Sequence, residues 1–213
     1  MRRILLCDTP AEFLQYILNL DEARHSYVNL VICCDRHLFL RRLVGCLKHV
    51  QTEGDVDEGQ SLLSNTLDNI ARSQNVGIAF CPTTAHLMAY LGTYRSGGRS
   101  TSEMAQHQGV LAILDPLTPL SKGGGLSAQR VSKIFAVAVQ VACNERTRLM
   151  ICQSDSIRFK GETFSGTDSW TVSIPLLDSD SLDDEEYDDV TTNVNRVVQR
   201  WFEFERVGIR NDT

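Results

Sequence analysis

The sequence lacks the motifs of several common enzyme classes. It contains no Gly-rich loop ending in Gly-Lys-Ser/Thr, the arrangement that holds a nucleoside triphosphate in phosphate-binding loops. It also contains no C-x-x-C, G-x-S-x-G or H-E-x-x-H segment, and its five histidines show no metal-ligand spacing. No apolar run approaches the ~20 residues that cross a bilayer. We therefore expect neither catalytic residues nor a metal site, and no membrane partner.

What is present indicates one globular domain. The chain has 213 residues, of which 42% are apolar, and that is enough to bury a sizeable core. Its seven cysteines are odd in number and stand mostly inside apolar runs, where a free thiol behaves as a small hydrophobe. No signal peptide precedes them, so we expect an intracellular, reducing compartment.

The acidity of the chain is local. Residues 178–189 (DSDSLDDEEYDD) hold eight acids and no base. Without them, the 27 acidic residues of the chain fall to 19, against 21 basic ones. We interpret the run as a solvated acidic loop within the domain. Two other interpretations stay open: a docking strip for a basic partner, or a gate that competes with nucleic acid for a basic groove.

Strands and helices alternate along most of the chain. Short apolar runs of the buried-strand type predict strands at 4–7, 28–34, 76–81, 110–114 and 149–152. Helical spacing of apolar residues predicts helices after Pro10, over 38–48, over 62–72 and after Thr83 or Thr84. The later segments 169–174 and 198–207 alternate with period two, which is typical of antiparallel strands. We therefore predict an α/β fold with a mainly parallel central sheet and C-terminal antiparallel strands.

The most informative stretch is 110–153. An apolar strand ends in Asp115, a loop with three glycines follows Lys122, a helix runs from Ser127 to about Arg146, and a second strand ends in Gln153. A strand of this kind with a terminal Asp is typical of phosphate-handling α/β domains, in which the Asp holds a metal-bound water. The alternative is a strand-end Asp that caps a turn.

The loop after the first strand is a poor phosphate site. Residues 7–12 (CDTPAE) contain no Gly and no Lys, and Pro10 removes a backbone donor. Asp8 and Glu12 would repel phosphate at a helix N-terminus that otherwise attracts it. We therefore expect no ATP site here, and no cofactor.

These segments together resemble RecA-type recombinases. The segments VLAILDPLTPL and LSAQRVSKIFAVAVQVACNERTRLMICQ resemble their core, and VGIAFCPTTAHLMAYL and RWFEFERVGIRND are similar to parts of the short recombinase paralogues of the Shu complex. The resemblance implies a single RecA-like domain over 1–213 and a degenerate nucleotide site. Its residues would be Asp115 as the Walker B acid, Gln153 as the Gln that couples nucleotide to DNA, Asp35 after the second strand, and Asp8 and Thr9 at the lost Walker A loop.

The resemblance also implies a function. We expect a pseudo-ATPase of the nucleus that acts in homologous-recombination DNA repair, as a heterodimer with another recombinase paralogue or a recombinase. It would help a recombinase filament to form or persist on single-stranded DNA. The residues expected to contact DNA are Lys122, Arg130 and Lys133, and those expected to contact the partner are Trp170, Phe202 and Phe204. The alternative is a RecA-like scaffold subunit of an Elongator-type tRNA-modification complex, which would also lack the Walker A loop. An unrelated structural adaptor is a third possibility.

Overall fold

A computed structural model of the chain describes residues 2–20, 27–52, 70–71, 73–95, 109–122, 125–177 and 190–207. The acidic run 178–189, the glycines at 123–124 and most of the predicted helix over 62–72 lie outside these residues. Among the described residues, no helix is long and apolar enough to cross a membrane.

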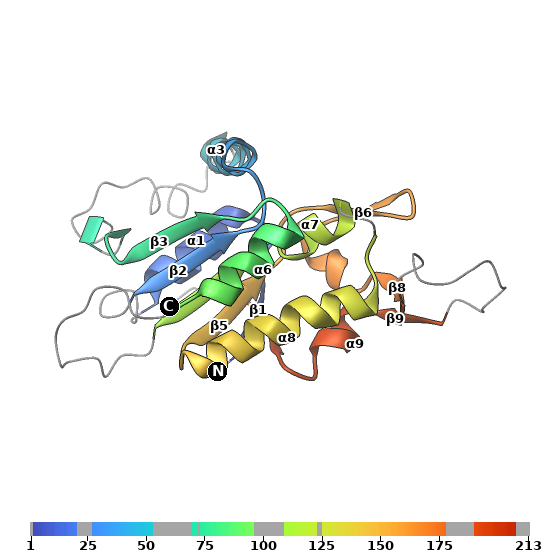
Figure 1. Ribbon diagram of the computed structural model, residues 1–213. Coiled ribbons are helices and arrows are strands. Elements are labelled where there is room, and N and C mark those ends of the chain that lie inside the picture. The colour runs from blue at the N-terminus through green and yellow to red at the C-terminus, as the bar shows by residue number, and fades with distance from the viewer. Residues whose placement is uncertain are drawn as a thin grey trace.

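The described chain forms a six-stranded parallel sheet with the order β10-β1-β5-β4-β2-β3 (Figure 1). Its strands are β1 (Arg2–Leu6), β2 (Val28–Ile32), β3 (Val76–Phe80), β4 (Val110–Leu114), β5 (Arg148–Cys152) and β10 (Glu203–Arg206). The five strands predicted for the sheet all lie in it, and the predicted RecA-like α/β fold class is confirmed.

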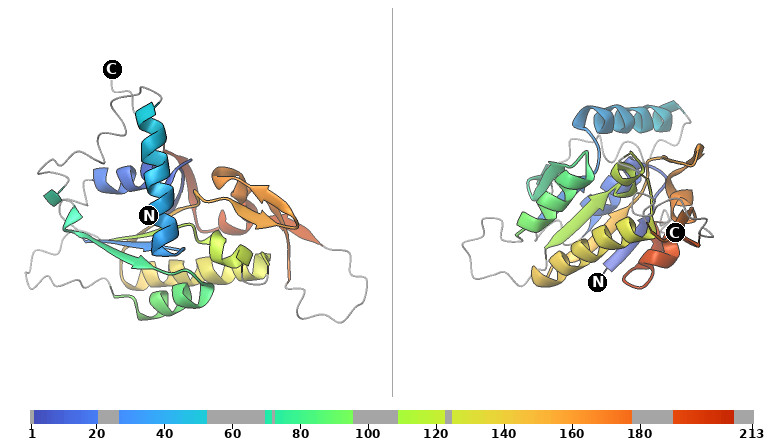
Figure 2. Two further views of the ribbon diagram at one scale, coloured as in Figure 1. Left: turned by 90° about the horizontal axis from the view of Figure 1, so that it is seen from above. Right: turned by 45° about the vertical axis from the view of Figure 1, so that its right-hand side comes forward.

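Helices cover both faces of the sheet. On one face lie α1 (Pro10–Asn19) and α3 (Arg36–Thr52), and on the other lie α6 (Thr84–Thr93), α8 (Ala128–Asn144) and the short α9 (Val194–Val198) (Figures 1 and 2). The helix α7 (Leu117–Lys122) follows β4 directly. Thr9, Thr83 and Ser127 each cap the following helix by accepting a backbone N–H with the side-chain oxygen.

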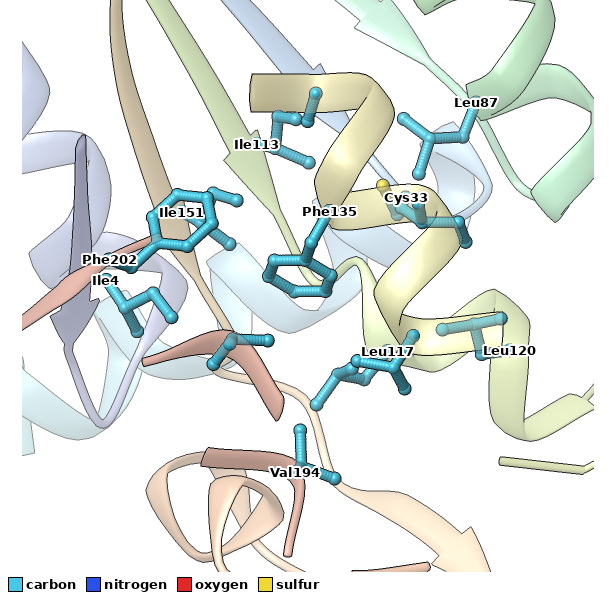
Figure 3. Packing of buried hydrophobic residues seen from close by; sticks show 14 of the residues in the cluster. Ile4, Cys33, Leu87, Ile113, Leu117, Leu120, Phe135, Ile151, Val194 and Phe202 are labelled. Carbon is cyan, nitrogen blue, oxygen red and sulfur yellow. The ribbon is translucent and has the colours of Figure 1, made fainter. Parts of the chain in front are cut away.

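Two hydrophobic clusters, one on each face, hold these layers together. On the α8 side Phe135 is central: its ring meets that of Trp170 edge-on, with centroids 6.1 Å apart. It also meets the ring of Phe202 edge-on, with centroids 5.7 Å apart; both residues are labelled in Figure 3. On the α1 side, Phe13 and Ile17 of α1 and Phe39 of α3 pack on the strands. Burial on both faces explains why β4 is apolar at all five positions.

The C-terminal part differs in detail from the prediction. The segment Gly166–Trp170 is a 3-10 helix, and within the part of the chain that the structure describes antiparallel pairing occurs only in two small separate sheets. These are β6 (Ile157–Phe159) with β7 (Glu162–Phe164), and β8 (Ser173–Pro175) with β9 (Thr191–Asn193). The predicted last strand is shorter, and it pairs in parallel with β1. Trp170 and Phe202 are 2% and 4% exposed, so they are core residues, and this corrects their assignment to a partner contact. Phe204 is 36% exposed.

Candidate functional site

Four of the strands bring the predicted site residues to one edge of the sheet. In a parallel sheet all the carboxyl ends meet at the same edge, where α/β proteins usually bind their ligands. The strands β1, β5, β4 and β2 are neighbours, with Leu5, Cys152, Leu114 and Ile32 at one level. Asp8 and Thr9 therefore lie at the same edge as Gln153, Asp115 and Asp35.

Asp115 is the centre of this edge. Its side chain is fully buried, and its backbone has a φ of 60°, a conformation that Asp tolerates better than most residues. One carboxylate oxygen accepts the backbone N–H groups of Ser154 and Asp155 at 2.7 and 2.9 Å and the Ser154 hydroxyl at 3.1 Å. The other lies 2.8 Å from the Arg42 guanidinium. The carboxylate is thus bound from three directions by groups of the chain itself.

Arg42 comes from α3 and joins two acids. Besides Asp115, it lies 3.3 Å from the Asp155 carboxylate and donates to the Ser154 hydroxyl at 3.3 Å. Burial alone would lower the pKa of Arg42, but the charge of Asp115, its hydrogen bond and the charge of Asp155 together raise it. For Asp155, burial raises the pKa, opposed by Arg42 and reinforced by Asp115. The guanidinium therefore remains charged and supplies the cation for both carboxylates.

Gln153 is also engaged within the chain. Its carbonyl oxygen accepts the backbone N–H of Leu117 at 3.0 Å. Its amide nitrogen donates to the Thr118 hydroxyl at 3.1 Å and to the backbone carbonyl of Asp155 at 2.9 Å. These bonds tie the start of α7 to the end of β5, and they use both amide hydrogens of this buried side chain.

The N-terminus of α1 is closed by its own residues. The Thr9 hydroxyl accepts the backbone N–H of Glu12 at 3.2 Å and donates to its carboxylate at 3.1 Å. The same carboxylate accepts the backbone N–H of Asp8 at 3.0 Å. This is a reciprocal capping arrangement, and it occupies donors that a phosphate would need. It also places the Glu12 charge where a phosphate would lie.

Asp35 stands apart from this cluster. Its side chain is exposed, and its backbone carbonyl accepts the N–H of Phe39 at the start of α3. Nearby Cys34 is buried, and this burial, reinforced by Asp115 and opposed by Arg42, raises the pKa of its thiol to about 11. Because the thiolate is the reactive form, Cys34 is a poor nucleophile at neutral pH.

Three residues of the site were not predicted as part of it: Arg42, Ser154 and Asp155. The sequence offered one signal. Phe39, Arg42, Leu43 and Cys46 follow one helical stripe, which places Arg42 on the inward side of α3. Nothing local indicates that the residues after Gln153 close around Asp115, since that contact spans 39 residues of chain.

The residues predicted to contact DNA lie on the α7–α8 segment. Lys122 is exposed at the end of α7, and its charge acts on Cys34 and Asp155, so it stands near the Asp115 cluster. Lys133 is exposed on α8, whereas Arg130 is half-buried and its backbone N–H donates to the Ser127 cap. The structure therefore places all three near the first turns of α8, at the carboxyl edge.

Within the described ranges, no group of three or more His, Cys, Asp or Glu side chains is arranged to hold a metal ion. In comparisons with known proteins, no family model, no curated protein and no solved structure matches this chain.

Proposed function

We propose that this chain is a non-catalytic RecA-like accessory protein of homologous recombination. It would work in the nucleus with another recombinase paralogue or a recombinase, and promote filament assembly on single-stranded DNA. The observation that carries the non-catalytic part is the internal use of Asp115. Its carboxylate is bound by Arg42 and by two backbone N–H groups, so a guanidinium stands where an active site would place a metal-bound water.

The closed N-terminus of α1 supports the same conclusion. Phosphate binding at a helix N-terminus needs free backbone N–H groups and no competing negative charge. Here Pro10 lacks an N–H, Thr9 binds the N–H of Glu12, and the Glu12 carboxylate binds the N–H of Asp8. A triphosphate would have to displace these contacts and lie against an acid.

Equilibrium binding of labelled ATP with Mg²⁺ tests this part. We expect no specific binding at micromolar concentrations, because both phosphate-facing elements are occupied. Saturable binding that Asp115→Ala abolishes and Asp35→Ala leaves intact would show a working nucleotide site and overturn the proposal.

The partner contact is better placed at β3 than at the late strands. The two edge strands of the sheet differ: β10 carries Glu203, Glu205 and Arg206, whereas β3 (VGIAF) has no charge and exposes 56% of Ile78. Charged edges discourage pairing and uncharged apolar edges invite it. We therefore place the paralogue contact at β3. Of the predicted contacts Trp170, Phe202 and Phe204, only Phe204 is exposed.

Affinity purification of the tagged chain from its own cells tests the partner. Recovery of a recombinase or its paralogues supports the proposal, and recovery of Elongator subunits instead would replace it with the tRNA-modification alternative. Ile78→Lys should reduce recovery of the paralogue, while Glu203→Lys on the opposite edge should not. Equal recovery with both variants would remove β3 from the contact.

The DNA contact is tested on the purified complex. Changing Lys122, Arg130 and Lys133 to Ala should weaken single-stranded DNA binding and lower its salt dependence, because each lost phosphate contact reduces the slope of log K against log salt by about 0.7. A control variant with Arg158, Arg196 and Arg206 changed to Ala removes the same charge from exposed positions elsewhere. Equal binding by both variants would refute the site assignment.

A further inference from the structure

Two cysteines, Cys33 and Cys81, stand side by side at the carboxyl edge of the sheet. The strands β2 and β3 pair in parallel as far as Ile32 opposite Phe80. Beyond that pair, the N–H of Cys81 donates to the carbonyl of Ile32 at 2.8 Å. The ladder therefore continues by one residue, and this brings Cys33 and Cys81 to the same level of two neighbouring segments.

Both thiols lie on the same face of the sheet. Cys33 and Cys81 belong to the hydrophobic cluster on the α8 side, in which Figure 3 labels Cys33. Successive residues of an extended chain alternate between the faces, and Cys34 accordingly belongs to the cluster on the α1 side. Burial raises the pKa of the Cys33 thiol, and the charge of the nearby Cys81 raises it further. The two sulfur atoms are thus close neighbours within one cluster.

The spacing of these two residues suits a disulfide. Neighbouring strands of a sheet lie about 4.8 Å apart. The Cα atoms of a disulfide are usually ~4.4–6.8 Å apart, so residues at one level of two adjacent strands can be bridged without moving the backbone.

Cys7 and Cys152 form a second pair, whose thiols share a hydrogen bond. Their backbones are out of register, because Cys152 lies opposite Leu5 of β1 and Cys7 comes two residues later. Two residues of strand rise and one strand spacing separate such Cα atoms by about 8 Å, beyond the ~7 Å that a disulfide spans without backbone movement. The fold therefore favours a bond between Cys33 and Cys81.

The pair joins an inner strand to an edge strand. In the described sheet β3 stands at the end of the strand order, with β2 as its neighbour. Segments held on one side open locally more readily than the centre of a sheet. Cys81 is followed by Pro82 and by Thr83, which caps α6. A bond from Cys33 to Cys81 would therefore hold both the end of β3 and the start of α6.

We propose that Cys33 and Cys81 form a reversible disulfide that clamps the edge strand β3 to β2 when the chain meets a low-molecular-weight disulfide such as glutathione disulfide. In the reduced chain the two thiols pack as small apolar groups. In the oxidised chain the bond opposes the local opening of β3. Transient, redox-sensing disulfides are the kind that reducing compartments contain. The inference does not rest on the proposed function in recombination.

The reaction is thiol–disulfide exchange in two steps. When the edge opens, the Cys81 thiolate attacks one sulfur of glutathione disulfide, forms a mixed disulfide and releases one glutathione thiolate. The Cys33 thiolate then attacks the Cys81 sulfur, forms the Cys33–Cys81 bond and releases the second glutathione. The two protons that the cysteines lose pass through solvent to the two glutathione thiolates. Two protein thiols are oxidised and one glutathione disulfide is reduced.

Peptide mapping of the oxidised full chain tests the bond. The folded chain is incubated with excess glutathione disulfide, its remaining thiols are blocked, and it is digested with trypsin without reductant. Cys33 lies in the tryptic peptide 25–36 and Cys81 in 73–95. We expect these two peptides to be linked with the loss of two hydrogen atoms, and dithiothreitol to separate them.

The exposed Cys143 serves as an internal control for the oxidant. It should take up glutathione under the same conditions, because it is accessible without any opening of the fold. A folded chain in which Cys143 is modified while peptides 25–36 and 73–95 stay unlinked would overturn the inference.

Single variants identify the sulfur atoms, because Cys33 and Cys34 share one peptide. Cys33→Ala and Cys81→Ala should each abolish the link. Cys34→Ala, at a buried position on the opposite face, should keep it. Circular dichroism of the reduced variants checks folding, and having two variants that remove the bond keeps the test valid if one of them does not fold. A link that persists in Cys33→Ala, or a main product that joins Cys7 to Cys152, would contradict the inference.

Amide hydrogen exchange measures the clamp itself. The amides of Val76–Phe80 should exchange at least about tenfold more slowly in the oxidised wild type than in the reduced one, since a covalent bond then opposes the opening of β3. Cys33→Ala treated with the same oxidant should show no such change. Equal exchange rates in the oxidised and reduced wild type would overturn the clamp. None of these measurements involves a partner protein, so the proposed function stands or falls separately.

Discussion

A fully buried carboxylate needs hydrogen-bond donors for both oxygens, and Asp115 receives them from different elements. Ser154 and Asp155 follow β5, and Arg42 comes from α3. These hydrogen bonds and the ion pair link α3 to the segments that follow β4 and β5 at the carboxyl edge of the sheet. Removing one partner of a buried ion pair lowers the free energy of unfolding by more than the intact pair contributes to it, because the remaining charge is left without a counter-charge.

Asp115→Asn should therefore lower the free energy of unfolding by about 3 kcal/mol. Asn accepts the same backbone conformation and nearly the same volume, so the loss reports the missing charge on the Arg42 side. Urea titration followed by circular dichroism measures the effect. The exposed Asp35→Asn should change it by no more than about 0.5 kcal/mol. Adding Arg42→Met to Asp115→Asn should restore part of the lost free energy of unfolding, because it removes the uncompensated guanidinium. An unchanged urea midpoint for Asp115→Asn alone would refute this account.

Asp155 makes stability depend on pH. Burial raises its pKa in the folded protein above the ordinary value of 3.8, so the folded state holds this proton more tightly than the unfolded chain. Its contribution to stability therefore falls as pH rises from about 3.8 through the higher folded pKa. The difference in unfolding free energy between the wild type and Asp155→Asn should decrease from pH 4 to pH 7. A difference that increases over this range would show that the ion pair with Arg42 lowers the pKa of Asp155 by more than burial raises it.

At the scale of secondary-structure elements, the sequence alone predicts those strands and helices whose signal lies in neighbouring residues. The five predicted strands contain short apolar runs, and β4, which is buried on both faces, is apolar at every position. Three helices begin at Thr or Ser caps that can be recognised from the residues alone. The C-terminal segments could not be assigned in this way. Their period-two alternation is a local pattern, but their structure depends on distant residues. Trp170 lies in a 3-10 helix and packs against Phe135. The strand β10 pairs in parallel with β1, about 200 residues earlier in the chain.

The cap of α1 gives a prediction at this scale. Thr9→Ala removes the hydroxyl that accepts the Glu12 N–H and donates to its carboxylate, so it should destabilise the protein by about 1 kcal/mol. Thr9→Ser keeps both bonds and should cost only a few tenths of that. Thermal unfolding of both variants measures the effect. Equal melting temperatures for Ala and Ser would show that the cap contributes nothing to α1.

For the whole molecule, the decisive contact joins the two ends of the chain. The strand β10 covers the outer edge of β1, with Ile4 opposite Phe204 and an ion pair between Arg3 and Glu205. Phe202, just before β10, fills the cluster around Phe135. The sheet is therefore complete only after the last described strand has docked, a long-range pairing that local sequence patterns do not contain.

A chain that ends at Arg200 should not form this fold cooperatively. It loses β10, exposes the edge of β1 and leaves a cavity where Phe202 lay, and that cavity alone costs about 3–5 kcal/mol, a large fraction of the stability of a typical domain. A chain that ends at Val207 keeps all the described strands and serves as the control. Urea unfolding should show a cooperative transition for the control and a broad, shifted or absent one for the shorter chain. A sharp transition with an unchanged midpoint in the chain ending at Arg200 would mean that the other five strands carry the stability without β10.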